Sequence, residues 1–141
     1  MHYFVKDKDI NYFCYESELI SSKTYNIDLN NTDFYLEFII HPTANSDTAY
    51  INIGDPLNNL QIGDIYGNAN CGLNFTGGTF YGKAISMNVD TKITVTRKGT
   101  NVILTVGGSS YSISNMNIIC STLKNVTING EVMEKLIVYS I

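Results

Sequence analysis

Short runs in which apolar and polar residues alternate recur along most of the chain. The clearest run extends from Asp33 to His41 and places four apolar residues on one face: Phe34, Leu36, Phe38 and Ile40. A period of two is that of a β-strand, because successive side chains of a strand point to opposite faces. Pro42 lacks an amide donor and therefore ends this predicted strand.

The same alternation predicts further strands at residues 49–53, 60–66, 72–75, 79–85, 123–128 and 135–141. Residues 93–114 predict a three-stranded antiparallel meander, with turns at residues 97–101 and at Gly107-Gly108. Residues 17–22 are a candidate for one helical turn, and residues 1–6 are a candidate neighbour of the last strand. The pattern as a whole predicts an all-β fold, an antiparallel β-sandwich.

Composition is consistent with one β-sandwich domain spanning residues 1–141. The chain has 141 residues, of which 44% are hydrophobic and 16% are charged, so it can bury a full core without disulfides. Its net charge is −4 and Arg97 is its only arginine. Because binding to nucleic acid needs clustered cations, no nucleic-acid partner is expected. The sequence has neither a signal-peptide pattern at its start nor an apolar run long enough for a membrane helix.

The cysteines and the acidic loop residues each leave two interpretations open. Cys14, Cys71 and Cys120 are widely spaced, and they are either three reduced, buried thiols or a Cys14–Cys120 disulfide with one free thiol. Three acidic residues in or near predicted loops are weak candidates for a calcium site: Asp47, Asp55 and Asp64. They offer hard oxygen ligands, but the density of a dedicated calcium cage is missing, and solvated turn residues are the alternative. No other metal or cofactor is expected.

Tyrosine is the most distinctive feature of the composition, with ten tyrosines and no tryptophan. A tyrosine ring can stack on a sugar or anchor a protein interface, and asparagine amides add hydrogen bonds. We expect a shallow ligand site at one rim of the sandwich, formed by six residues: Tyr50, Asn52, Tyr66, Asn68, Asn70 and Tyr81. The alternative is that these tyrosines serve as strand formers only.

Three stretches carry a family resemblance: residues 34–40, residues 92–108 and residues 130–140. The second is similar to a hairpin of the form I-x-V-x-R-x-G-x-x-V-x-L-x-V-x-G, and the third to a closing strand that reads G-x-I-x-x-L-x-I-Y. Together they resemble the concanavalin A-like (laminin G-like) jelly-roll superfamily. That resemblance implies a jelly-roll sandwich that binds carbohydrate or protein, with glycoside hydrolases as a minority.

Enzyme chemistry finds no support in the sequence. Hydrolases of the superfamily resemble one another in an E-x-D-x-x-E strand that supplies the two carboxylates of the reaction, whereas Glu37 stands alone in its strand. His2 and His41 have no partner at metal-ligand spacing. Neither a G-x-S-x-G elbow nor a phosphate-binding glycine loop is present.

The expected function is therefore a non-catalytic recognition module that binds carbohydrate or a cell-surface receptor. The Asn- and Tyr-rich composition also resembles modules of phage tail appendages and microbial adhesins, which implies a place on a virion or cell surface within a larger assembly. The alternative is a structural virion or scaffold domain that forms a homo-oligomer through tyrosine-rich surfaces and binds no small ligand.

Overall fold

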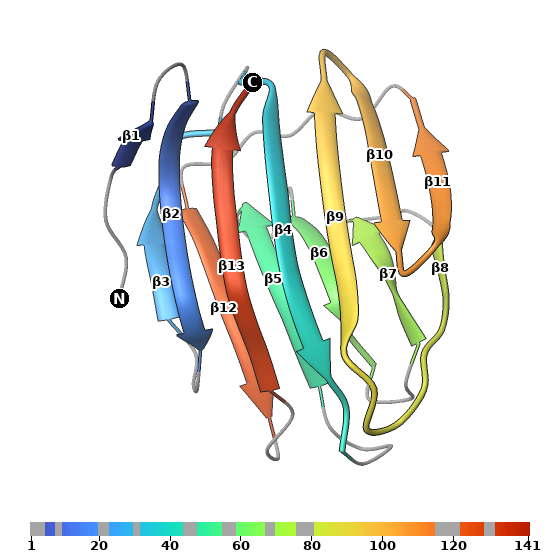
Figure 1. Ribbon diagram of the computed structural model, residues 1–141. Coiled ribbons are helices and arrows are strands. Elements are labelled where there is room, and N and C mark those ends of the chain that lie inside the picture. Colours follow the sequence, from blue (N-terminus) through green and yellow to red (C-terminus); the bar gives the residue numbers. More distant parts are fainter. Residues whose placement is uncertain are drawn as a thin grey trace.

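A computed structural model of the chain describes two stacked layers of β-strands (Figure 1). The residues described are 5–7, 10–19, 23–29, 32–43, 48–54, 59–66, 70–75, 81–114, 122–128 and 132–141. These residues form strands, turns and connections, and no helix occurs among them.

Both sheets are antiparallel throughout the described pairings. The seven-stranded sheet has the order β1 (Val5–Asp7), β2 (Ile10–Leu19), β13 (Val132–Ser140), β4 (Phe34–His41), β9 (Thr91–Lys98), β10 (Asn101–Val106) and β11 (Ser109–Ile113). The six-stranded sheet has the order β3 (Lys23–Asn26), β12 (Thr122–Ile128), β5 (Thr48–Gly54), β6 (Asn59–Asp64), β7 (Asn70–Phe75) and β8 (Tyr81–Ala84). The prediction of an all-β, antiparallel sandwich is confirmed.

The core lies between the two sheets and is built from the alternating positions of their strands. In β4 every second residue is buried: Phe34, Leu36, Phe38 and Ile40. They share one buried cluster with the inward row of β5 on the opposite sheet, Ala49, Ile51 and Ile53. Burial of this apolar surface stabilises the sandwich, and it fixes the register of each strand, because a slip by one residue would turn the apolar row to solvent.

The predicted meander is confirmed as β9, β10 and β11, and its first turn is Gly99-Thr100. β6 ends two residues earlier than predicted and β8 ends one residue earlier. In β11, Tyr111 and Ile113 pack against the core but are only partly buried.

Two predictions about the N-terminal part were wrong. Residues 17–19 belong to β2 and form no helical turn, because they continue the ladder with β13, in which Glu18 lies opposite Glu134. Residues 20–22 lie outside the described residues. The neighbours of β13 are β2 and β4. β1 lies one strand farther out, where Val5 pairs with Tyr12 of β2.

The sequence pattern predicted that Arg97 is part of a turn, but Arg97 lies in β9 and its side chain links the two sheets. Its side chain is 5% exposed. Nη1 donates to the carbonyl oxygens of Leu29 at 3.2 Å and Thr32 at 2.8 Å, and Nε donates to that of Gly99 at 2.9 Å. Leu29 and Thr32 lie on the connection that leads from β3 in one sheet to β4 in the other, so one cation holds this connection against the β9–β10 hairpin.

The open side of the sandwich at β8 and β11 is closed by two polar contacts. The Tyr111 hydroxyl donates to the Gly82 carbonyl oxygen at 3.1 Å, and Lys83 Nζ donates to Ser109 Oγ at 3.3 Å. A carbonyl that already accepts a hydrogen bond is less available to a foreign strand, so the contact also shields this sheet edge.

Cys71 is a reduced, buried thiol of the core, as both interpretations require. Cys14 lies in β2 opposite Val138, and Cys120 lies outside the described residues. The Cys14–Cys120 disulfide therefore stays a prediction. No helix in the described part of the chain has the length and apolarity needed to cross a bilayer.

Candidate functional site

The solvent face of β5 carries two of the predicted ligand-binding residues. Tyr50 and Asn52 alternate with the buried residues Ala49, Ile51 and Ile53, so they point away from the core. Thr48 belongs to the same row, at the start of the strand. All three are partly buried. The row Thr48, Tyr50, Asn52 is called the β5 row below.

Two side-chain oxygens of the β5 row have no hydrogen-bond partner among the described residues. They are Thr48 Oγ1 and Asn52 Oδ1, each buried, and they flank Tyr50 along the strand. A buried polar atom without a partner costs about 1–3 kcal/mol, and native proteins rarely leave one without a reason. The β5 row therefore needs hydrogen-bond donors that the described residues do not supply.

A row of glycines continues from Tyr50 across the sheet. Tyr50 lies opposite Gly63, Gly63 opposite Gly72, and Gly72 opposite Gly82. Gly63 has φ +130°, and a Cβ there would lie 2.5 Å from the carbonyl oxygen of Ala49, next to Tyr50. Since cross-strand partners share a face, the described cross-strand neighbours of Tyr50 on this flank carry no side chain.

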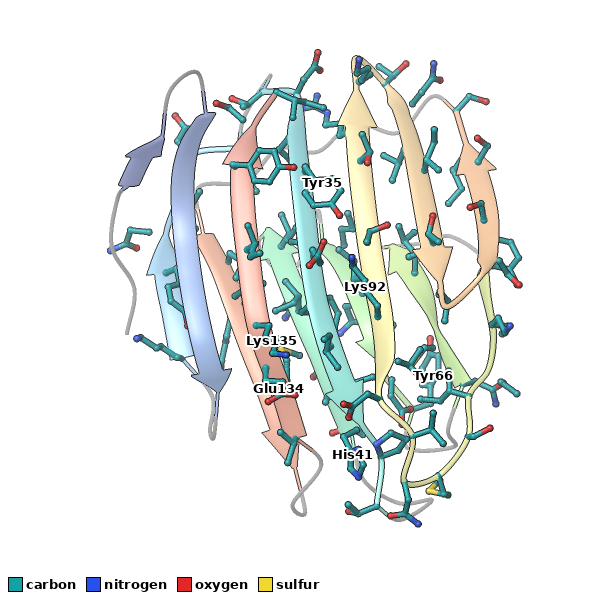
Figure 2. The ribbon with its side chains drawn as sticks, in the orientation of Figure 1. Tyr35, His41, Tyr66, Lys92, Glu134 and Lys135 are labelled. Carbon is teal, nitrogen blue, oxygen red and sulfur yellow. The ribbon has the colours of Figure 1, made fainter. Side chains whose placement is uncertain are left out.

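The six predicted residues do not form one cluster. Asn70 lies two residues before Gly72 in β7, and therefore on the same face as the β5 row. Tyr66 follows the end of β6 and is 57% exposed, near the same end of the sandwich as His41 (Figure 2). Tyr81 lies opposite Leu73, a core residue, and Asn68 is outside the described residues. The structure thus places Tyr50, Asn52 and Asn70 on one face of the six-stranded sheet, with Asn70 two strands away from β5.

The calcium candidates are also separated. Asp64 is the last residue of β6, is fully buried, and lies between Ala49 and Cys71 in the sheet, so it faces the interior and not a solvated loop. Asp47 and Asp55 lie outside the described residues. Within the described residues, no group of three or more His, Cys, Asp or Glu side chains is arranged to hold a metal ion.

The solvent face of the seven-stranded sheet holds a second polar and aromatic cluster, which the sequence did not reveal. The Tyr35 hydroxyl donates to Glu37 Oε1 at 2.6 Å, and Lys92 Nζ lies 3.2 Å from the same oxygen. The rings of Tyr35 and Tyr139 are 5.0 Å apart and tilted by 31°. These four residues are called the β4 cluster below. Glu37 and Lys92 are 55 positions apart, so only the β4–β9 pairing brings them together.

The environment of Tyr35 opposes its ionisation. Partial burial raises the pKa of the Tyr35 hydroxyl, and the hydrogen bond to Glu37 and the negative charge of Glu37 raise it further. The hydroxyl therefore remains a donor to Glu37 over the whole physiological pH range.

We expect Tyr35→Phe to change the alkaline behaviour of the protein. Because the pKa of Tyr35 is raised in the folded state, its contribution to stability is complete below the unfolded pKa of about 10 and is lost as the pH rises further. The free energy of unfolding should fall less steeply above about pH 10 in Tyr35→Phe than in the unsubstituted protein, as measured by urea unfolding at stepped pH. Equal slopes would contradict the assignment, and Tyr66→Phe is the control.

His41 and Asp90 form an exposed pair at one end of the sandwich. His41 Nδ1 lies 2.8 Å from Asp90 Oδ1, and the amide of Asn88 donates to the Pro42 carbonyl oxygen at 2.8 Å. Both contacts tie the connection before β9 to the end of β4. The pair thus has a structural role that the sequence spacing did not indicate.

Solved structures of several proteins share this sandwich. Domain 4 of AbnA, an extracellular arabinanase from Geobacillus stearothermophilus solved with arabinotriose, is 12% identical over 99% of this chain and 75% of that chain, with a TM-score of 0.61. Galectin LEC-6 from Caenorhabditis elegans is 14% identical over 86% of this chain and 95% of that chain, with a TM-score of 0.59. A botulinum neurotoxin type C structure is 8% identical over 99% of this chain and 47% of that chain, with a TM-score of 0.60.

No protein-family model matches the sequence, and no curated protein matches it either. At identities of 8% to 14% the likeness to solved structures shows the fold. The chain is therefore a β-sandwich of the jelly-roll type found in lectin-like and carbohydrate-binding domains.

Proposed function

We propose that this chain is a non-catalytic carbohydrate-binding module and that its saccharide binds to the β5 row. One observation carries the proposal: two unpaired oxygens, Thr48 Oγ1 and Asn52 Oδ1, flank a half-buried tyrosine on a solvent face. Sugars supply both groups that such a row needs, hydroxyl donors for the oxygens and an apolar C–H face for the ring.

Each residue of the proposed site has a separate role. The Tyr50 ring stacks against the C–H face of one sugar ring, beside the flank that Gly63 leaves without a side chain. The Thr48 and Asn52 oxygens are buried in the unliganded chain, so each side chain must rotate toward the surface to accept a hydrogen bond from a hydroxyl on either side of the stacked ring. Asn70 extends the site toward the end of the sheet. A few oriented polar groups around one aromatic contact give specificity with modest affinity.

The similar structures support this class of ligand. The arabinanase domain was solved with arabinotriose, and the neurotoxin is described as interacting with two ganglioside molecules. Galectin LEC-6 and a carbohydrate-binding module of Bacillus subtilis share the fold. The proposal is for binding without catalysis, because the sequence lacks the paired-acid strand of hydrolases with this fold. We propose further that the module serves a larger assembly on a virion or cell surface.

A glycan array of the purified chain tests the proposed class of ligand. We expect binding to a related set of glycans, unchanged by a calcium chelator because the proposed site contains no calcium ligand. A blank array together with a stable trimer in light scattering would contradict the proposal and favour the structural scaffold that oligomerises through tyrosines. Loss of binding on chelation would move the site to the acidic loop residues.

We expect Tyr50→Ala to weaken binding of the best array glycan by about tenfold or more, because it removes the stacking ring. Asn52→Ala should weaken it by about fivefold through the loss of one hydrogen-bonding amide. The matched control is Tyr66→Ala, which removes an exposed tyrosine beyond the end of the face. Isothermal titration calorimetry measures all three. Loss of binding in Tyr66→Ala with none in Tyr50→Ala would place the ligand at the loops instead.

A further inference from the structure

The β4 cluster lies on the sheet opposite the β5 row, and its surroundings are regular rows across several strands. One row runs through Tyr139, Tyr35 and Thr96, and the next through Ile137, Glu37 and Thr94. The face therefore presents a pair of tyrosine rings next to a carboxylate and hydroxyl side chains. Figure 2 shows Tyr35 and Lys92 over β4 and β9, with Glu134 and Lys135 on the lower part of β13.

Glu37 offers one oxygen to a ligand. Both of its contacts, from the Tyr35 hydroxyl and from Lys92 Nζ, are made to Oε1. Oε2 has no contact of this kind with the described residues and is not buried without a partner. The Lys92 side chain is 56% exposed and keeps further N–H donors for solvent or ligand. A carboxylate oxygen and an ammonium side by side can accept from one hydroxyl and donate to the next.

β13 is distorted where it passes this cluster. Glu134 lies opposite Ile39 and Ile137 opposite Glu37, so two residues of β13 face the single residue Phe38 of β4. One of the two is Lys135, which has φ +57° although it is not glycine. Bulges redirect side chains and occur often next to functional sites, and strained backbone concentrates there too. Lys135 is exposed on this bulge.

The charges of this face select the kind of ligand. Within the β4 cluster, the negative charge of Glu37 is balanced by the positive charge of Lys92, whose Nζ lies 3.2 Å away. A polyanion would gain nothing from this balance, in a chain whose net charge is −4. Aromatic rings next to a paired donor and acceptor suit a neutral polyol.

We infer that the β4 cluster is a second saccharide site, for a neutral sugar, on the face opposite the β5 row. The inference rests on the proposed function for the class of ligand, and on its own geometry for the place. Two sites on opposite faces cannot both bind the same short oligosaccharide, but they can bind two separate glycan chains at once. Such a module would gain avidity on a dense glycan surface.

Titration calorimetry and variants test this inference in the full chain. The probes are arabinotriose, maltotriose, cellotriose and galactotriose, each titrated to millimolar concentration. Glu37→Gln keeps the shape of the side chain but weakens its acceptor, and Lys92→Gln removes the neighbouring cation. Tyr50→Ala disables the β5 row, and Lys98→Gln, on the same strand as Lys92, is the matched control.

We expect at least one probe to bind with two sites per chain, and Glu37→Gln to weaken one of them by about tenfold while the other is unchanged. Tyr50→Ala should leave the Glu37-dependent site in place. Binding that Tyr50→Ala abolishes completely, with no effect of Glu37→Gln or Lys92→Gln, would overturn the second site and leave the proposed function standing. Binding that only Glu37→Gln and Lys92→Gln reduce would support the second site and contradict the β5 row. Absence of binding by every probe would overturn both.

Discussion

Arg97→Met should lower the free energy of unfolding by about 3 kcal/mol, the largest effect expected from a single change of a charged residue in this chain. Methionine keeps much of the apolar stem but donates no hydrogen bond. The carbonyl oxygens of Leu29, Thr32 and Gly99 would then lose the guanidinium donors that hold them at 2.8 to 3.2 Å. Because Arg97 is 5% exposed, water cannot readily replace these donors.

The effect of Arg97→Met can be measured by urea unfolding followed by circular dichroism. A loss of about 3 kcal/mol corresponds to a fall in the melting temperature of roughly 12 °C for a chain of this size. Lys98→Met is the matched control, because Lys98 is the next residue and is exposed; it should change stability by less than about 0.5 kcal/mol. A loss below about 1 kcal/mol for Arg97→Met would show that the connection between β3 and β4 does not depend on this side chain.

Gly63→Ala is expected to cost about 3 kcal/mol as well, for a steric reason. Gly63 has φ +130°, a conformation that residues with a side chain rarely adopt. The new Cβ would also lie 2.5 Å from the carbonyl oxygen of Ala49 and 2.9 Å from Cα of Tyr50. Both are backbone atoms of the partner strand, so β5 and β6 would have to separate locally.

Substitutions of two other glycines separate the steric and the backbone-conformation contributions to the loss of stability in Gly63→Ala. Gly107 has φ +59° with open space around a Cβ, so Gly107→Ala should cost only about 1 kcal/mol, from backbone conformation alone. Gly108 has open space and no positive φ, so Gly108→Ala should be close to neutral. Equal stability changes at Gly63 and Gly107 would contradict a close approach of β5 and β6. Because Gly63 adjoins Tyr50, Gly63→Ala should also weaken glycan binding in the fraction that stays folded.

The sequence was most informative where one face of a strand is buried. Alternation predicted β4 and the meander of β9, β10 and β11, because their inward rows carry the core. β2 was missed, since Ile10–Leu19 mixes apolar and polar residues at both parities. The buried role of Arg97 was missed for a related reason: two of its three partners are carbonyls of a connection 65 or more residues away.

The candidate sites could be predicted only in part. Tyr50 and Asn52 follow from alternation along a single strand, and the structure places them on a solvent face as the sequence indicated. That Thr48 Oγ1 and Asn52 Oδ1 have no partner among the described residues depends on the neighbouring strands, which the sequence of β5 alone does not specify. The contact of Glu37 with Lys92 can be recognised only from the β4–β9 register. The bulge at Lys135 could not be predicted, because the residue with positive φ is neither glycine nor asparagine.

The most direct test of glycan binding at the β5 row is a map of amide chemical-shift changes in the isotopically labelled chain, titrated with the best array glycan. The proposal predicts that the largest changes include residues 48–52 and Asn70, and that those at residues 48–52 disappear in Tyr50→Ala. Changes confined to other parts of the chain, with none at Thr48, Tyr50 or Asn52, would contradict it.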